Sequence, residues 1–310
     1  MTKQSIKTIT IATRNSPLAM WQAEFTANLI EQTFPDIKTV LLPMTTKGDQ
    51  ILNVTLDKIG GKGLFLKELE QAMIAKKADI AVHSMKDVPA DMPKDFTICS
   101  IFKRHDASDA FVSNKFENLD QLPHNAIVGT SSLRRQSQLL AQRPDLTVLP
   151  LRGNVQTRLK KLDDNQYDAI ILATAGLERM QLDHRIKSKL KPNKWLPAVG
   201  QGAVGVECLS SNIEMINLLT QLTDKNSAQC VNAERAMNKV LNGSCSVAIG
   251  AYAEIFQGMI SMQATVNSPD GSKFIRKHAQ AKDPDELGTN IANMLLADGA
   301  QEILDLANDD

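Results

Sequence analysis

Short apolar runs that end abruptly in polar residues constrain the fold of this chain more than any other feature. The run Ile80–Val82 is typical of a strand buried in a parallel sheet, and it leads at once into the sequence His-Ser-Met-Lys-Asp-Val-Pro over residues 83–89. The proline excludes a helix through that point. In open α/β sheets, ligands bind beyond the carboxyl ends of the strands, which makes Lys86 and Asp87 candidates for a functional site. The alternative interpretation is a solvated loop pair.

Four other strand-like runs end in the same way, each with arginine close behind. They are residues 6–12 before Arg14, Ser16 and Pro17, residues 126–129 before Ser132, Arg134 and Arg135, residues 147–151 before Arg152 and Arg158, and residues 169–173 before Arg179. Ser16 is predicted to cap a helix whose first residue is Pro17. Thr130, Ser131 and Ser132 are predicted to be the capping residues of the helix that carries Arg134 and Arg135. The pattern places six of the eleven arginines at strand-to-helix corners.

Such corners favour the binding of anions. Helix N-termini attract negative charge through their free N–H groups and the macrodipole. Arginine adds a planar fork that matches a carboxylate or phosphate with two hydrogen bonds. Corners that converge on one side of a sheet therefore predict a ligand with several negative charges, and the alternative is a scattered, solvated basic surface.

Composition indicates a compact enzyme rather than a polyelectrolyte. A chain of 310 residues, 43% of them hydrophobic, is expected to form two or three domains. Its formal net charge of zero argues against a protein that coats nucleic acid. No apolar run reaches the roughly 18 residues of a membrane span, and the N-terminus shows no signal-peptide pattern. We therefore expect a cytoplasmic protein without a nucleic-acid or membrane partner.

The four cysteines fall into two groups. Cys99, Cys208 and Cys230 lie in apolar surroundings and are predicted to pack in cores. Without Cys-x-x-Cys pairs or clustered histidines, neither a metal site nor a disulfide framework is expected. Cys245 instead follows a predicted helix, capped by Ser227 and stopped by Asn-Gly, in a loop of small residues. A reactive thiol and an idle loop thiol are both compatible with that position.

The order of elements predicts two α/β units and a smaller third domain. Helices at 18–34 and 66–76 and a strand at 39–46 belong to the first unit, and residues 103–196 repeat the pattern. Residues 196–205 indicate a hinge followed by a strand that could return to the first sheet. From about residue 225 the pattern becomes a helix, three strands near 247–255, 259–266 and 272–280, and one closing helix near 284–307, which is typical of an α+β domain.

The glycine-rich segment 58–65 matches neither a phosphate-binding loop nor a dinucleotide fingerprint, because the required spacings are absent. Three glycines around Lys62 suggest a mobile flap, and a plain flexible turn is the alternative.

In its motifs the chain resembles the hydroxymethylbilane synthase (porphobilinogen deaminase) family over essentially all of its length. The matching motifs are Ala-Thr-Arg-x-Ser-Pro-Leu-Ala at 12–19, Gly-Gly-Lys-Gly-Leu-Phe at 60–65, His-Ser-Met-Lys-Asp-Val-Pro at 83–89, Gly-Thr-Ser-Ser-Leu-Arg-Arg at 129–135, Leu-Arg-Gly-Asn-x-x-Thr-Arg at 151–158, Ala-Val-Gly-Gln-Gly at 198–202 and the Cys245 loop. The resemblance implies two domains like the halves of a type II periplasmic binding protein, with an active cleft between them. They would comprise residues 1–102 with 200–222, and residues 103–199. A third domain, residues 223–310, would carry the cofactor cysteine.

The same resemblance implies an activity. Four porphobilinogen molecules would condense head to tail into linear hydroxymethylbilane, with release of four ammonia. The cofactor would be a dipyrromethane held as a thioether on Cys245. The enzyme would act as a monomer and pass its product to the next tetrapyrrole enzyme.

The resemblance also assigns roles residue by residue. Asp87 would be the catalytic acid/base, assisting ammonia loss and stabilising the cationic azafulvene. The proposed cofactor contacts are Lys86, Ser132, Arg134, Arg135 and Arg158, and the proposed substrate contacts are Arg14, Ser16, Arg152, Arg179 and, on the flap, Lys58, Lys62 and Phe65. Arg134 and Arg135, at a helix N-terminus, are expected not to serve the core.

Two departures from the family pattern lie beside the cofactor cysteine, where Ser244 replaces a glycine and Ala248 a proline. Both are expected to loosen that loop. The rival interpretation is a two-lobed binding protein for an anionic solute, against which an acid at the site and the lack of an export signal count. A phosphoryl-transfer enzyme is disfavoured because the chain has no phosphate loop or acidic metal cluster.

Overall fold

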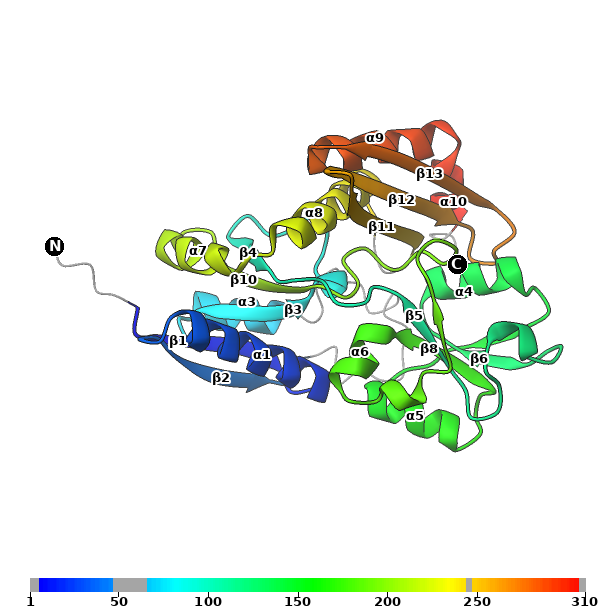
Figure 1. Ribbon diagram of the computed structural model, residues 1–310, viewed down its shortest axis with the longest axis horizontal. Helices are drawn as coiled ribbons and strands as arrows, with labels where there is room; N and C mark the ends of the chain where they lie inside the picture. Colours follow the sequence, from blue (N-terminus) through cyan, green and yellow to red (C-terminus); the bar gives the residue numbers. More distant parts are fainter. Residues whose placement is uncertain (1–5, 47–65, 244–246, 307–310) are drawn as a thin grey trace. The chain divides into compact units, whose positions relative to one another are not determined.

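The computed structural model describes residues 6–46, 66–243 and 247–306 (Figure 1). These residues form two compact units, of which the first holds residues 6–46, 66–104 and 203–228. The second holds residues 105–202 and the described residues from 229 onward. Each unit is described by itself.

The first unit is built on a five-stranded mixed sheet with the strand order β2-β1-β3-β10-β4. Its elements are β1 (Thr8–Arg14), α1 (Pro17–Thr33), β2 (Lys38–Met44), α3 (Lys67–Ile74), β3 (Ile80–Ser84), β4 (Phe96–Ile101), β10 (Val204–Leu209), α7 (Ile213–Leu219) and short 3-10 helices at Met85–Asp87 and Thr220–Leu222. Strand β1 runs parallel to β2 and β3, so the carboxyl ends of these three strands lie at one edge of the sheet.

The return of the chain to the first sheet is confirmed by β10, which follows the predicted hinge and inserts between β3 and β4. It pairs antiparallel with both neighbours, with Val204 opposite Ser84. The chain therefore re-enters the sheet at the carboxyl end of β3.

The second unit contains another five-stranded mixed sheet, with the order β7-β6-β8-β5-β9. Its elements are β5 (Asp109–Val112), β6 (Ile127–Gly129), α4 (Leu133–Gln142), β7 (Thr147–Leu149), α5 (Val155–Asp163), β8 (Ala169–Ala173), α6 (Thr174–Arg179), β9 (Ser188–Leu190) and 3-10 helices at Leu119–Gln121 and Asp183–Arg185. Strands β6, β7 and β8 are parallel, whereas β5 runs antiparallel to β8 and β9.

The last part of the chain forms an antiparallel three-stranded sheet covered by helices. Its elements are α8 (Lys225–Val240), β11 (Ala248–Phe256), β12 (Met259–Asn267), β13 (Phe274–Ala281), α9 (Pro284–Ala297) and α10 (Ala300–Leu306). Met237, Met262 and Leu287 are fully buried where helices and sheet meet. The predicted fold class, two α/β sheets and a small α+β domain, is confirmed.

Two local predictions in this region were wrong. The closing helix is interrupted at Gly299, whose φ of +94° lies in the left-handed region that ends a helix. The cap of α8 is Asp224 rather than Ser227, because the Ser227 N–H donates to Asp224 Oδ1 at 2.8 Å. The Ser227 hydroxyl instead accepts from the Arg104 N–H at 2.8 Å.

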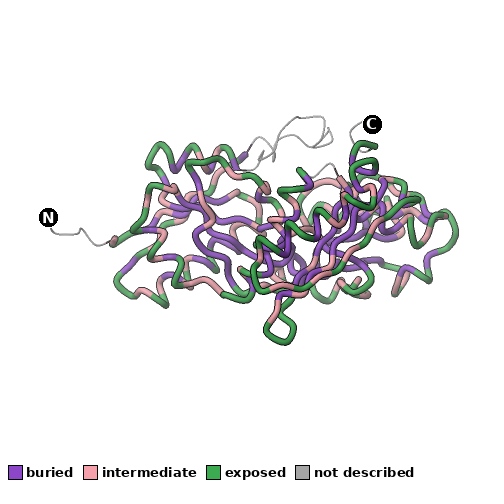
Figure 2. The backbone as a smooth tube through the Cα atoms, turned by 90° about the horizontal axis from the view of Figure 1, so that it is seen from above, coloured by how far each residue is buried: buried purple, intermediate pink, exposed green. Residues whose placement is uncertain are grey.

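Burial concentrates in the central strands β3, β5, β8 and β10, whereas the edge strands β2, β7, β9 and β13 hold no buried residue. Buried segments are purple in Figure 2. Cys99, Cys208 and Cys230 are buried free thiols, which confirms their prediction as core residues. Across the described residues, no helix combines the length and the apolar character needed to cross a membrane.

Candidate functional site

Asp87 lies on a short turn directly beyond β3. The 3-10 helix Met85–Asp87 begins with a buried residue, because Met85 is 1% exposed and its N–H donates to Ala203 O at 3.0 Å. Two residues later Asp87 is exposed. The strand end therefore anchors the turn and presents a carboxylate to the solvent, at the edge that the sequence predicted.

Arg14 and Ser16 come from the neighbouring strand end. Arg14 is the last residue of β1, which runs parallel to β3 with Ala12 opposite Ala81. Ser16 caps α1, accepting from the Ala19 N–H at 3.4 Å, and Pro17 is the first helical residue, as predicted. The sheet thus brings these two residues to the same edge as the Asp87 turn.

In the second unit, two predicted corners are tied to each other. Strands β6 and β7 are parallel neighbours. Beyond them, Ser131 Oγ donates to Leu151 O at 3.1 Å and accepts from the Leu151 N–H at 2.9 Å. Ser132 caps α4 as predicted, accepting from the Arg135 N–H. Arg152 follows Leu151 directly, so its backbone is fixed beside this cap.

Arg158 lies one turn inside α5 and reaches back to the corner. Its Nε donates to Gly153 O at 2.7 Å. Gly153 has a φ of +113°, and a Cβ there would lie 2.6 Å from the Thr157 side chain, so only glycine fits. Asn154 then caps α5. Arg152 and Arg158, both half-buried, therefore flank a rigid turn.

Arg134 and Arg135 differ from expectation, because both are buried and serve the core. Asp109, which is fully buried, accepts from Arg134 Nη1 at 2.8 Å and from Arg135 Nε and Nη2 at 3.1 and 2.7 Å. Trp195 Nε1 and Gln201 Nε2 donate to the same carboxylate at 2.8 and 2.9 Å. We call these five residues the Asp109 hub.

Charges within the Asp109 hub shift the pKa values of its members. Burial opposes the charge on Asp109, but the two guanidiniums hold the pKa of its carboxyl well below its usual range. Burial lowers the pKa of Arg134, and Asp109 opposes that shift. Arg134 Nε is buried without a hydrogen-bond partner among the described residues. The expectation that these arginines do not serve the core was therefore wrong.

Arg179 is also placed differently from the prediction. It is the last residue of α6 rather than a residue near the helix N-terminus. Its Nη2 donates to Gly202 O at 2.8 Å, and burial lowers its pKa to about 10. The guanidinium nevertheless remains a cation at neutral pH.

Four predicted residues, Lys58, Lys62, Phe65 and Cys245, lie outside the described residues. The helix end before Cys245 is described. The Gly243 N–H donates to Asn238 O at 2.9 Å, and a Cβ at Gly243 would lie 2.0 Å from Asn238 Oδ1. A larger residue at Gly243 would therefore require the Asn238 side chain to move.

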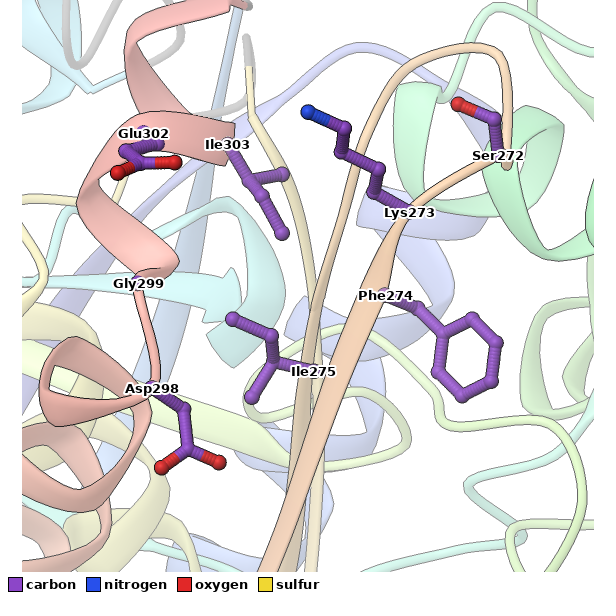
Figure 3. Close-up of a pocket in the computed structure, with 8 residues that line it drawn as sticks. All are labelled: Ser272, Lys273, Phe274, Ile275, Asp298, Gly299, Glu302 and Ile303. Carbon is purple, nitrogen blue, oxygen red and sulfur yellow. The ribbon is translucent and has the colours of Figure 1, made fainter.

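A separate hollow of about 380 Å³ lies on the C-terminal sheet, beside the start of β13 (Figure 3). Lys273, Ile275, Asp298 and Glu302 are among its lining residues. Its mixed charges do not suit a polyanion, and it contains none of the predicted site residues.

Sequence reasoning missed the buried partners of the site. Asp109 opens an apolar strand, and Glu207 lies inside the apolar run of β10. A charged residue within such a run is the signal that could have identified them. Considered separately, each unit offers cations and hydroxyl groups at its strand ends, and the first unit adds the exposed acid Asp87. This is chemistry suited to proton transfer on a carboxylate-rich ligand.

Comparisons with known proteins agree with this chemistry. Residues 9–217 match the family model described as porphobilinogen deaminase, dipyromethane cofactor binding domain, and residues 228–297 match the porphobilinogen deaminase C-terminal domain. The chain is 53% identical over 300 residues to a porphobilinogen deaminase of Thiobacillus denitrificans, covering 96% of this chain and 98% of the relative. It is 52% identical over 302 residues to the enzyme of Nitrosomonas europaea, covering 97% and 98%.

Solved structures match this chain with much lower sequence identity. The VFT2 domain of BvgS from Bordetella pertussis matches with a TM-score of 0.45 and 12% identity, covering 74% of this chain and 92% of that one. A putative methionine-binding lipoprotein from Bacillus subtilis matches with a TM-score of 0.44 and 11% identity, covering 71% and 91%.

Proposed function

This chain belongs to the porphobilinogen deaminase family, and on that premise we propose that Asp87 is its catalytic acid/base and that its arginine-bearing strand ends bind carboxylates. The activity is that of a transferase of tetrapyrrole biosynthesis. Four porphobilinogen molecules condense head to tail, four ammonia molecules are released, and hydrolysis yields linear hydroxymethylbilane.

The dipyrromethane cofactor of the family carries carboxylate side chains, and the residues of this chain fit such a group. The buried Arg134 Nε, which has no partner among the described residues, is a donor that a carboxylate would satisfy. Once bound, the cofactor supplies a pyrrole carbon to which the first substrate is joined. We assign its covalent attachment to Cys245, as a thioether.

Other cofactor contacts are assigned to the strand ends of both units. Lys86, Ser132 and Arg158 would hold the cofactor carboxylates directly. Arg134 would do so through Nε. Arg135 donates through Nε, Nη1 and Nη2 to Asp109 and to Ile171 O. Its contribution would therefore be to hold the hub and the first turn of α4 in place.

Asp87 would move protons and stabilise positive charge. A carboxylate on an exposed turn can accept a hydrogen bond from a pyrrole N–H. That interaction strengthens as ammonia leaves and the pyrrole becomes cationic, so it lowers the barrier rather than only binding substrate. The same carboxylate can accept the proton that is lost after the carbon–carbon bond forms.

Substrate binding is assigned to the remaining cations. Each porphobilinogen brings an acetate and a propionate, and Arg14, Arg152 and Arg179 can each take one carboxylate in a two-bond contact. Ser16 adds a hydroxyl donor beside Arg14. Lys58, Lys62 and Phe65 would contribute from the glycine-rich segment.

The observation that carries this proposal is the family match along 96% of the chain, combined with an acid on the turn after β3. Intact mass of the denatured protein tests the cofactor. The protein should exceed its sequence mass by two pyrrole units, and Cys245→Ser should lack that excess while remaining folded. An unmodified mass in a preparation that turns over porphobilinogen would refute the attachment.

We further propose a three-domain division at residues 1–102 with 200–222, 103–199 and 223–310, which three separate sheets support. We also propose a monomeric cytoplasmic enzyme that passes its product to the next tetrapyrrole enzyme. Three free thiols suit a reducing compartment. Light scattering on purified enzyme tests the monomer, and cell fractionation tests the location.

A further inference from the structure

A buried acid–base pair lies beneath the turn that carries Asp87. His83 Nε2 and Glu207 Oε2 are 2.8 Å apart, and the two side chains are 4% and 0% exposed. The pair joins β3 to β10, where Glu207 lies opposite Ala81 and Gly205 lies opposite His83. We infer that this pair is a positioning device for the Asp87 turn, an inference that rests on the role proposed for Asp87.

Stability alone does not account for the pair. Removing two polar groups from water is costly, and apolar residues of similar volume commonly replace a buried ion pair without loss of stability. Glu207 Oε1 is buried and has no hydrogen-bond partner among the described residues, so the carboxylate is only partly satisfied. What the pair does provide is a directional contact, which fixes His83 against one residue of β10.

His83 is linked to the turn through Met85. Met85, the first residue of the 3-10 helix, packs its side chain over Gly205, the residue of β10 that lies opposite His83. Gly205, opposite His83, leaves room for it, since a Cβ there would lie 2.1 Å from Met85 Sδ. The Met85 N–H donates to Ala203 O. A shift of His83 along β10 would therefore move Met85, and with it the first residue of the turn.

Ser84, which lies between His83 and Met85 in the chain, is held on the opposite face of the sheet. Ser84 Oγ accepts from Gln22 Nε2 of α1 at 2.8 Å, and Gln22 is 3% exposed. The end of β3 is thus clamped on both faces, by α1 through Ser84 and by β10 through His83. Asp87 follows Ser84 by three residues. Because the end of β3 is held in place, the position of the Asp87 carboxylate is restricted as well.

Helix α3 places a further titratable group, Glu70, near the pair. Burial raises the pKa of Glu70, and the nearby Glu207 carboxylate raises it further, while His83 opposes both. The Glu70 carboxyl on α3 therefore belongs to the electrostatic surroundings of the pair, while the contact that orients the imidazole is the one to Glu207.

The test separates positioning from folding. In the double variant His83→Met/Glu207→Leu the pair is removed without leaving a buried polar group behind. We expect its Tm to stay within a few degrees of the parent, its cofactor mass to be unchanged and its KM to change little. Because displacement of a reacting group by about 1 Å costs on the order of 100-fold, kcat should fall by about 10- to 100-fold.

Two single variants complete the series. Glu207→Gln keeps an oxygen that can accept from His83 and should recover most of the lost kcat. Glu207→Asp withdraws the carboxylate by one methylene and should give an intermediate kcat. Ser100→Ala is the matched control, because it removes the acceptor of a part-buried hydrogen bond in the same sheet, which Thr223 Oγ1 donates to Ser100 Oγ at 3.1 Å, away from β3.

A parent-like kcat in the double variant would overturn the inference, as would a loss of kcat that only follows a loss of folded protein. If the double variant does not fold, Glu207→Asp decides, since a stable Glu207→Asp enzyme with unchanged kcat also overturns it. In an Asp87→Asn background, the His83→Met/Glu207→Leu change should cost little further kcat, because both act through one group. An inactive parent without cofactor mass would instead refute the proposed function.

Discussion

Replacing Asp109 with asparagine would leave two buried guanidiniums facing a neutral amide. The Asp109 carboxylate accepts from Arg134, Arg135, Trp195 and Gln201 at distances of 2.7 to 3.1 Å. The amide oxygen of asparagine can keep some of these hydrogen bonds. The amide NH₂ group, however, would face other N–H donors of the hub. Breaking a buried ion pair by removing one partner costs about 3–5 kcal/mol.

That free energy converts into a measurable change in thermal stability. For a folded unit of this size, 1 kcal/mol corresponds to about 2–4 °C in Tm. Asp109→Asn should therefore lower the Tm by about 6–20 °C, with Asp109→Ala at the larger end because it also opens a cavity. Thermal unfolding of purified full-length protein, followed by circular dichroism, measures this.

The matched control is Asp145→Asn. Asp145 also bonds an arginine, accepting from Arg143 Nη2 at 2.7 Å, but near the surface. Its loss should change the Tm far less than the loss of Asp109. Equal effects of the two variants, or a Tm change below about 2 °C for Asp109→Asn, would refute the reasoning that the hub is a buried ion cluster.

The contribution of Asp109 to the stability of the fold depends on pH. The folded-state pKa of Asp109 is depressed, so its contribution is complete above the unfolded pKa of about 3.9 and is lost as pH falls toward the folded value. The Tm difference between parent and Asp109→Asn should be constant from pH 5 to 8 and should shrink only below about pH 4.

Three further predictions concern the reaction and the core. Asp87→Asn should reduce porphobilinogen turnover by about 10²–10³ while retaining cofactor mass, whereas Asp87→Glu should keep part of the activity; an Asp87→Asn enzyme within a few-fold of the parent would remove Asp87 from the mechanism. Cys99, Cys208 and Cys230 should resist alkylation in the native enzyme and react on denaturation, because all three are buried and because a hydrogen bond with Cys208, together with burial, raises the pKa of Cys99; rapid native labelling of any of them, located by peptide mass, would contradict this. Gly271→Ala should destabilise the fold, because φ there is +74° and a Cβ would lie 2.4 Å from Ser137 O; an unchanged Tm would contradict that geometry.

Local patterns in the sequence predicted those parts of the fold that local physics determines. Ser16 and Ser132 cap their helices as expected, because a hydroxyl before a helical run satisfies an N–H two or three residues on. Strand β10 returns to the first sheet and lies between β3 and β4, where its apolar run is buried. Its antiparallel direction was not predicted, since periodicity carries no information on strand direction.

The wrong prediction for the two arginines and the unpredicted buried acids have one cause, which is pairing between residues far apart in the chain. Arg134 and Arg135 of α4 were predicted to be surface cations because their partner, Asp109, lies 25 and 26 residues earlier in the chain, on strand β5. Glu207 and His83 are 124 residues apart. Nothing within a short window distinguishes an arginine that binds a ligand from one that binds a buried carboxylate, so the corner pattern assigned one role to arginines that the structure places in different surroundings.

These two roles are nevertheless connected by charge. The hub holds two guanidiniums and one carboxylate, so it retains a formal charge of +1 within a buried region. That charge lies at the N-terminus of α4, where the macrodipole has the same sign. Because water screens a buried charge poorly, it attracts a carboxylate near Ser132 even without direct contact. Arg134 and Arg135 can therefore stabilise the fold and favour an anionic cofactor at once, and a substitution at either should weaken both. A variant of Arg135 that kept full cofactor load but lost stability would separate the two effects and assign this residue to the core alone.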